Sequence, residues 1–185
     1  SPGLDFETRL TAKPDAPSVL GRELGRKGYT PAVLAIGTNT DPYQPIEARY
    51  RIMRRLLEVL SDWNHPVAIV TKGALIERDV DILSDMARRN LVSVGISVTS
   101  LDPALSRKLE PRAPVPARRL AAVRTLSQAG VPVRAMVAPV IPVVTDREME
   151  SILEAAAAAG ARAAPRTLLR LPFQVAPLFR DWLER

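Results

Sequence analysis

The stretch Leu91-Val92-Ser93-Val94-Gly95-Ile96-Ser97-Val98 decides the fold class of this chain. It is short, β-branched and nearly continuously apolar, which is typical of a strand buried on both faces. Similar runs lie at residues 32–37, 67–71 and 131–138, and a weaker one, interrupted by a proline, lies at 163–170. Strands of this kind predict a parallel sheet covered by helices.

The segments between these runs have the spacing of amphipathic helices, with apolar residues three or four positions apart. We expect helices from Asp15 or Ser18 to Lys27, at 46–60, at 77–89, at 116–129, from the N-cap candidate Asp146 to Ala159, and at 175–183. The alternation of strands and helices predicts an α/β fold, either an open doubly wound sheet or a (β/α) barrel. We expect a single domain over residues 1–185, with residues 4–12 as an accessory strand.

Composition excludes several classes of chemistry. The chain has 185 residues, a net charge of +6, no cysteine and one histidine. Disulfides, thiolate catalysis and a zinc or iron–sulfur site built from this chain alone are therefore excluded, and a metal site of several histidines is not expected. His65 precedes a predicted strand and is interpreted as a turn residue. The sequence shows no signal peptide and no membrane span, so we expect a cytoplasmic protein without a membrane partner.

Parallel sheets bind ligands at the carboxyl ends of their strands, so the residues that follow each strand are the candidates. The loop after the first strand is polar, and Asn39, Thr40 and Asp41 could bind an amine or hydroxyl groups, although an Asx-turn that caps a helix is an alternative. Lys72 follows the second strand, where it suits a carboxylate or a phosphate, although a plain surface lysine is equally consistent.

The third and fourth strands are followed by further candidates. Ser97 and Thr99 share one side of an extended chain, and Asp102 is expected to cap a helix. Glu110 and Arg112 lie in a proline-rich charged loop, where they pair with each other, line a pocket or are solvated.

The apolar segment at residues 139–141 has backbone groups that suit the edge of a ring such as adenine, and an ordinary linker is the alternative.

These strand ends together resemble one family. The loop at residues 37–47, which contains Thr40-Asp41-Pro42-Tyr43-Gln44-Pro45-Ile46-Glu47, is similar to the spore photoproduct lyase-like branch of the radical S-adenosylmethionine (SAM) superfamily, whose uncharacterised relatives are called DNA repair photolyases. Thr71-Lys72, residues 97–102 and Glu110-Pro111-Arg112 support the resemblance, which covers roughly residues 4–146. It implies a partial (β/α)6 TIM-like barrel of parallel strands, in which SAM lies across the strand ends. A [4Fe–4S] cluster would cleave SAM reductively to a 5′-deoxyadenosyl radical.

The resemblance also implies roles for individual residues. Asn39, Thr40 and Asp41 would contact the amino group of SAM, Lys72 its carboxylate, Ser97 its ribose or carboxylate, and Pro139, Val140 and Ile141 its adenine. Further pocket residues would be Tyr43, Thr99, Glu110 and Arg112. No metal ligand is expected in this chain.

The chain departs from the family at one decisive point. The family holds its cluster with a Cys-x3-Cys-x2-Cys loop, and this chain has no cysteine. We therefore expect a fragment that lacks the first barrel strand and the cluster loop, and that cannot perform radical chemistry by itself. The complete enzyme would need SAM, the cluster and an external electron donor, and would act on an unknown substrate, with DNA-related lyase chemistry as one hypothesis.

Two other functions stay open. The chain could be a non-radical (β/α) domain that binds a nucleotide or another phosphate-bearing ligand. It could also be a basic nucleic-acid-binding module, which would need its arginines on one exposed face. The arginines considered for that face are Arg51, Arg54, Arg55, Arg118, Arg119 and Arg124.

Overall fold

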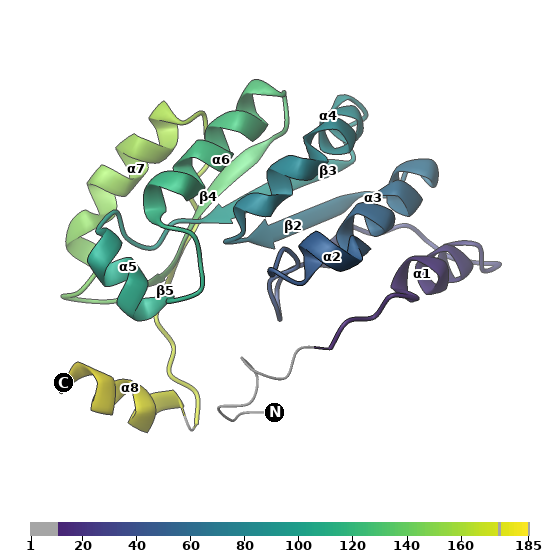
Figure 1. Cartoon of the computed structure of the whole chain (residues 1–185). Helices are drawn as coiled ribbons and strands as arrows, with labels where there is room; N and C mark the ends of the chain where they lie inside the picture. The colour runs from purple at the N-terminus through teal and green to yellow at the C-terminus, as the bar shows by residue number, and fades with distance from the viewer. Residues whose placement is uncertain (1–10, 174, 185) are drawn as a thin grey trace.

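The apolar runs of the sequence form five parallel strands that lie side by side in chain order. The computed structural model describes residues 11–173 and 175–184, and its sheet has the order β1-β2-β3-β4-β5 (Figure 1). The strands are β1 (Leu34–Ile36), β2 (Val67–Thr71), β3 (Val92–Ser97), β4 (Val133–Val140) and β5 (Arg166–Leu168). The sheet is a curled half-barrel, which confirms the predicted partial (β/α) barrel with parallel strands.

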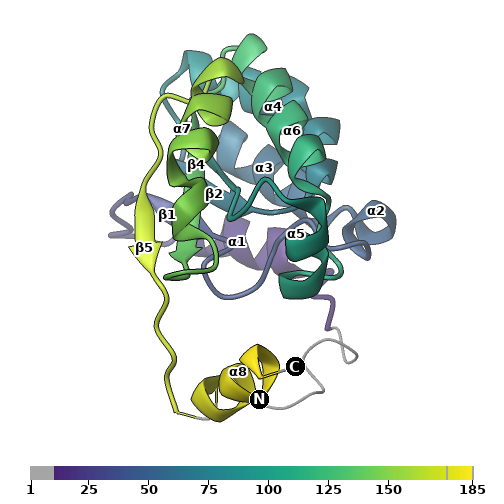
Figure 2. The same cartoon turned by 90° about the vertical axis from the view of Figure 1, so that its left-hand side faces the viewer.

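Helices cover one face of this sheet. Helices α3, α4, α6 and α7 lie along it, whereas α8 lies apart from the sheet in both views (Figures 1 and 2). The helices are α1 (Ala16–Leu24), α2 (Glu47–Tyr50), α3 (Ile52–Asp62), α4 (Val80–Arg88), α5 (Pro103–Leu109), α6 (Pro116–Gln128), α7 (Met149–Ala158) and α8 (Val175–Leu183), with 3₁₀ turns η2 (Ala74–Asp79) and η3 (Asp146–Glu148). Among the described residues, no helix is long and apolar enough to span a membrane.

The core lies between the sheet and these helices. Alternate strand residues, such as Ile69, Val94 and Val133, are almost fully buried there against Leu57 and Leu126 of the helices. Burying one such aliphatic side chain contributes about 1.5–3 kcal/mol. This apolar layer is what holds the carboxyl ends of the strands at fixed positions.

The prediction of one continuous helix at residues 46–60 is wrong, because the helix is interrupted at Arg51. That residue is left-handed, with φ of 49°, and separates α2 from α3. The side chain of Glu47 explains the break. Its carboxylate accepts hydrogen bonds from the N–H groups of Ile52 (2.9 Å) and Met53 (3.0 Å). An acidic group that accepts from the free N–H groups of a first turn stabilises a new helix start.

Other predicted boundaries also shift. Helix α1 ends at Leu24 rather than Lys27. Asp146 does not cap α7, because it lies in the 3₁₀ turn η3 and the N-cap position of α7 is Glu148; its carboxylate accepts from the N–H of Arg147. The weak fifth strand is present but short. The accessory strand expected at residues 4–12 falls outside the described residues except for residues 11 and 12, which belong to no strand.

His65 lies at the amino-terminal start of β2, far from the strand ends that bind ligands in such folds. Its Nδ1 lies 3.0 Å from the carbonyl oxygen of Pro66, and its Nε2 lies 2.6 Å from the hydroxyl of Tyr29. A carbonyl oxygen only accepts, so Nδ1 carries the proton and Nε2 accepts from Tyr29. His65 lies buried between the turn at residues 63–64 and β2, next to the turn in which it was predicted.

Candidate functional site

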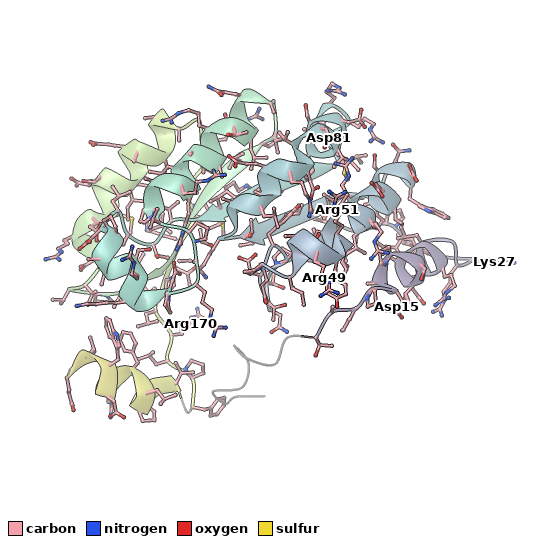
Figure 3. All side chains as sticks on the ribbon, in the orientation of Figure 1. Asp15, Lys27, Arg49, Arg51, Asp81 and Arg170 are labelled. Carbon is pink, nitrogen blue, oxygen red and sulfur yellow. The ribbon has the colours of Figure 1, made fainter. Side chains whose placement is uncertain are left out.

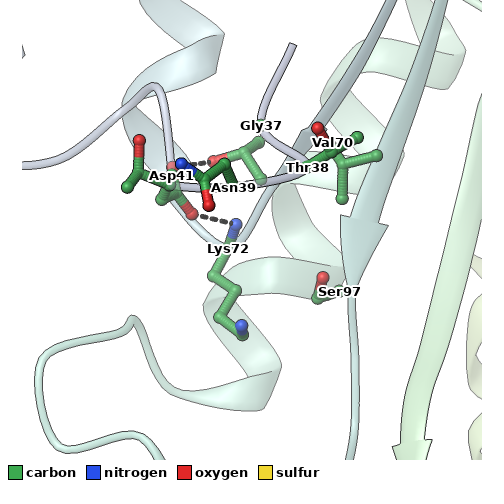
Figure 4. A pocket seen from close by; sticks show the side chains of 9 residues that line it. Gly37, Thr38, Asn39, Asp41, Val70, Lys72 and Ser97 are labelled. Atoms are coloured by element: carbon green, nitrogen blue, oxygen red, sulfur yellow. Dashed lines mark hydrogen bonds between the residues drawn. The ribbon is translucent and has the colours of Figure 1, made fainter. Parts of the chain in front are cut away.

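A polar cleft lies at the carboxyl ends of β1, β2 and β3. Its volume is about 190 Å³. The residues that line it are Gly37, Thr38, Asn39, Thr40, Asp41, Val70, Thr71, Lys72 and Ser97 (Figure 4). Five residues selected from the sequence, from three separate strand ends, are thus brought to one place. The cleft is smaller than the roughly 300–1,000 Å³ of a typical small-molecule site, so it suits one end of a ligand rather than a whole cofactor.

Asp41 fixes the loop that forms one side of the cleft. Its Oδ1 accepts from the hydroxyl of Thr71 (2.6 Å) and the N–H of Tyr43 (2.9 Å), and its Oδ2 accepts from the N–H of Lys72 (2.7 Å). The contacts to Thr71 and Lys72 join the loop after β1 to the end of β2, and Figure 4 shows the one to Lys72 as a dashed line. Asp41 was predicted from the sequence to contact a ligand. Its described hydrogen bonds show a structural role, because they hold the end of β2 in place.

We expect Asp41→Ala to lower the free energy of unfolding by about 2–3 kcal/mol, because three hydrogen bonds to a charged acceptor are lost. Urea unfolding followed by circular dichroism measures this. Asp102→Ala is the matched control, since the Asp102 carboxylate also accepts backbone N–H groups, those of Ala104 and Leu105, but caps α5 outside the cleft. Loss of an N-cap costs about 1 kcal/mol. Equal losses in the two variants would contradict the special role of Asp41.

Gly37 lets the loop pass close to β2. Its φ is 96°, and a Cβ atom at this position would overlap the carbonyl oxygen of Val70. Only glycine combines this backbone conformation with this approach. No role was assigned to Gly37 from the sequence, although a glycine directly after a predicted apolar strand is the signal that could have indicated one.

Tyr43 was predicted to line the pocket, and the structure places it in the core instead. Its side chain is 4% exposed, and its hydroxyl donates to Oδ2 of the fully buried Asp79 at 3.1 Å. Burial, together with the Asp79 carboxylate, raises the pKa of Tyr43 far above its usual value, so the hydroxyl keeps its proton. Tyr43 packs in the core beneath the loop that it belongs to and does not line the cleft.

Lys72 extends from the end of β2 at the cleft. Its ammonium lies 3.4 Å from Oε1 of Glu110, and Oε2 of Glu110 lies 2.6 Å from the buried guanidinium of Arg119. Glu110 and Arg112 do not line the cleft, and Arg112 is exposed. Glu110 thus contacts a cleft residue without lining the cleft itself.

The remaining predicted residues separate into two groups. Ser97 lines the cleft, whereas Thr99 is buried and does not. Pro139 and Val140 belong to strand β4 rather than to the linker that was an alternative for them, and neither they nor Ile141 line the cleft.

Glu148 was missed by sequence reasoning. It braces the turn after β3, where its carboxylate accepts from the hydroxyl of Ser100 (2.9 Å) and the N–H of Leu101 (2.7 Å). These partners lie more than forty residues away in the sequence, so no local pattern indicates the contact.

Comparison with known proteins agrees with this geometry. The profile of the radical SAM superfamily matches residues 14–156, most of the chain. The chain belongs to the radical SAM superfamily.

Its curated relatives include the uncharacterized protein Rv2578c of Mycobacterium tuberculosis, which is 37% identical over 187 residues covering 100% of this chain and 55% of the relative. The uncharacterized protein MJ0683 of Methanocaldococcus jannaschii is 29% identical over 109 residues, covering 59% of this chain and 40% of the relative. This radical SAM chain therefore spans about half the length of the curated relatives it matches, or less.

Solved structures share the fold of this radical SAM chain. SuiB of Streptococcus suis bound to S-adenosylmethionine has a TM-score of 0.58 at 15% identity, over 82% of this chain and 35% of SuiB. A cysteine-to-serine mutant of spore photoproduct lyase has a TM-score of 0.61 at 18% identity, over 78% of this chain and 41% of the lyase. At these identities the likeness concerns the half-barrel itself.

The arginines considered for nucleic-acid binding do not form the single free basic face which that function needs. Arg119 is 1% exposed, Arg54 pairs with Glu58 and Asp81, and Arg118 pairs with Glu77. Figure 3 shows Arg49 and Arg51 on the same side of this radical SAM half-barrel as the acidic Asp81. Charges of both signs share this surface, so the net positive charge is not gathered there on one free basic face.

The residues of this chain do not fit an iron–sulfur cluster. The sequence contains no cysteine, and residues 11–173 and 175–184 contain no group of three histidine or acidic side chains that could hold a metal ion. The cleft does fit the amino-acid end of SAM, because it combines an ammonium group, a carboxylate, hydroxyl groups and an amide. The cleft of this radical SAM chain therefore has residues suited to SAM, whereas the chain has no cysteine to hold the cluster.

Proposed function

We propose that this chain is the SAM-binding half-barrel of a radical SAM enzyme, and that the cleft receives the methionyl end of SAM. The observation that carries the proposal is the cleft itself. Polar groups of β1, β2 and β3 converge at the carboxyl edge of the sheet, in a chain that belongs to this superfamily. In the complete enzyme, SAM would be cleaved reductively at a [4Fe–4S] cluster to give a 5′-deoxyadenosyl radical.

Each cleft residue has chemistry that suits one group of SAM. The Lys72 ammonium would bind the carboxylate, as a cation with three donors does. Asn39 and Thr40 would accept from the amino group through their side-chain oxygens, beside the carboxylate of Asp41, and Ser97 would donate to the ribose or carboxylate. Pro139 is partly exposed at the end of β4, where adenine would lie, whereas Val140 and Ile141 are buried behind it.

Cluster ligands would come from outside these 185 residues, and an external electron donor would reduce the cluster. The substrate is not indicated by the fold, because neighbours with the same half-barrel include a spore photoproduct lyase and an enzyme bound to a precursor peptide. A DNA-related substrate therefore stays a prediction.

We expect Lys72→Met to weaken SAM binding about 10- to 100-fold, because a charge-assisted hydrogen bond contributes about 1.5–3 kcal/mol and each 1.4 kcal/mol is tenfold. Isothermal titration calorimetry with the purified chain measures the affinity. Lys108→Met is the matched control, since Lys108 is exposed on α5 outside the cleft. 5′-Methylthioadenosine, which lacks the amino-acid end, should bind both variants equally.

Two outcomes would overturn the proposal. If SAM binds the wild-type chain and Lys72→Met equally well, the methionyl end is not in this cleft. If inorganic phosphate or ATP binds and SAM does not, the chain is instead a non-radical domain for a phosphate-bearing ligand.

A further inference from the structure

A buried cation lies behind the cleft, on a helix that takes no part in lining it. Arg119 of α6 is 1% exposed. Its Nε donates to the carbonyl oxygen of Pro114 (2.6 Å), and its Nη1 donates to the carbonyl oxygen of Ser97 (3.1 Å), the cleft residue at the end of β3. A guanidinium stays charged at any ordinary pH, so a buried one needs an anion beside it.

Glu110 supplies that anion. Its side chain is 14% exposed, and its Oε2 lies 2.6 Å from Nη2 of Arg119, near enough for an ion pair although the two atoms are not aligned as a hydrogen bond. If Glu110 turned away, Arg119 would be left buried and uncompensated, which is strongly unfavourable. The carboxylate of Glu110 is therefore held in place, with Oε1 pointing toward Lys72.

Lys72 is the partner with freedom to move. Its side chain is 39% exposed, and its ammonium is 3.4 Å from Oε1 of Glu110. A lysine side chain loses about 2 kcal/mol of rotamer entropy when it is fixed in one position. If a rigid anion already orients the ammonium, part of this rotamer entropy is lost before a ligand binds. The entropy cost of binding is then smaller, an effect known as preorganisation.

We propose that Glu110 is a positioning residue, which is anchored by Arg119 and orients the ammonium of Lys72 for the carboxylate of the ligand. The inference rests on the proposed function, because it names the residue that prepares Lys72 for SAM. The ammonium of Lys72 has three N–H donors, and its distance to Glu110 is long, at 3.4 Å. A ligand carboxylate in the cleft therefore binds the ammonium of Lys72, while Glu110 stays paired with Arg119. Arg119 also holds the backbone of Ser97, so one buried cation connects the β2 side and the β3 side of the cleft.

The first test needs no ligand. The chain has four lysines, Lys13, Lys27, Lys72 and Lys108. A limiting amount of an acylating reagent, followed by mass spectrometry, gives the labelling of Lys72 relative to the other three in the same sample. We expect relative labelling of Lys72 to rise at least threefold in Glu110→Gln. Glu77→Gln is the control, because Glu77 pairs with Arg118, next to Arg119 on α6, and does not line the cleft.

The second test uses SAM affinity in a double-mutant cycle. Glu110→Gln should weaken SAM binding about three- to tenfold, which corresponds to the ordering of one flexible side chain. In the Lys72→Met background the same substitution should change nothing, since Glu110 acts only through Lys72. A purely structural Glu110 would weaken binding by the same factor in both backgrounds, and that result would overturn the inference.

Glu110→Gln leaves a buried charge and can prevent folding, so a second variant is included. The double variant Glu110→Gln, Arg119→Met removes both buried charges, a replacement that proteins often tolerate. Lys72 should label as strongly in it as in folded Glu110→Gln. If Lys72 labels as in wild type in the variants that fold, the inference is wrong. If wild type does not bind SAM, the proposed function fails, and the labelling alone then decides whether Glu110 orients Lys72.

Discussion

Gly37→Ala should lower the free energy of unfolding by more than about 4 kcal/mol, a loss that places it among the rare severe substitutions. Two effects add up. A residue with a Cβ pays about 1–2 kcal/mol for a left-handed conformation, and φ at Gly37 is 96°. The new methyl group would also overlap the carbonyl oxygen of Val70, a backbone atom of β2 in a residue that is paired with Gly95 of β3.

Gly28→Ala separates the two effects. Gly28 has nearly the same φ, 86°, but nothing lies within 4 Å of a Cβ built there. This control should therefore lose only the conformational part, about 1–2 kcal/mol. Urea unfolding of wild type and both variants gives the comparison. If Gly37→Ala is no less stable than Gly28→Ala, the close approach of the loop to β2 is not as described.

Asp79→Ala should lower the free energy of unfolding by about 3–5 kcal/mol, which is the range for one partner removed from a buried ion pair. Asp79 is fully buried and accepts from Nε (2.9 Å) and Nη2 (2.8 Å) of Arg78, as well as from the hydroxyl of Tyr43. Without it, the charge of Arg78 keeps only Glu47 as an ion-pair partner among the described residues, and the Tyr43 hydroxyl loses its acceptor.

Asp81→Ala is the matched control for this prediction. Asp81 lies two residues after Asp79 and pairs with Arg54, but its side chain is 64% exposed. Exposed ion pairs contribute about 0–1 kcal/mol, so this variant should unfold close to wild type. Thermal and urea unfolding of both variants measure the difference. A loss below about 1 kcal/mol for Asp79→Ala would show that water replaces its partners and that the network does not support the cleft.

These predictions concern the loop at residues 37–47 and Asp79, which accepts a hydrogen bond from Tyr43 of that loop. Within residues 37–47, Gly37 permits the close approach, Asp41 holds the end of β2, Tyr43 enters the core and Glu47 starts α3. Several residues of this polar loop therefore have structural roles in forming the cleft. Asn39 and Thr40 line the cleft and carry the direct ligand contacts that we propose.

The sequence by itself determined the parallel sheet covered by helices, the edge of the sheet that carries the cleft and the Asp102 cap of α5, whereas the choice of a partial barrel over an open doubly wound sheet came from the family resemblance. These features depend on local properties: apolar runs, helical spacing and the polar residues directly after each strand. Parallel strands bring such residues together whatever the remaining side chains do. Five predicted residues meet in the cleft for this reason.

Only the tertiary structure decided which polar side chains face the cleft and which support it. Tyr43 and Arg119 are polar residue types that would be expected in a pocket or at the surface, yet both are buried. The hydroxyl of Tyr43 donates to Asp79, and the guanidinium of Arg119 is paired with Glu110. The break at Arg51, by contrast, accompanies a local contact, because Glu47 accepts from N–H groups only five and six residues further on. A polar group enters a core only when a partner from another segment is within reach, and that partner is set by packing rather than by sequence spacing.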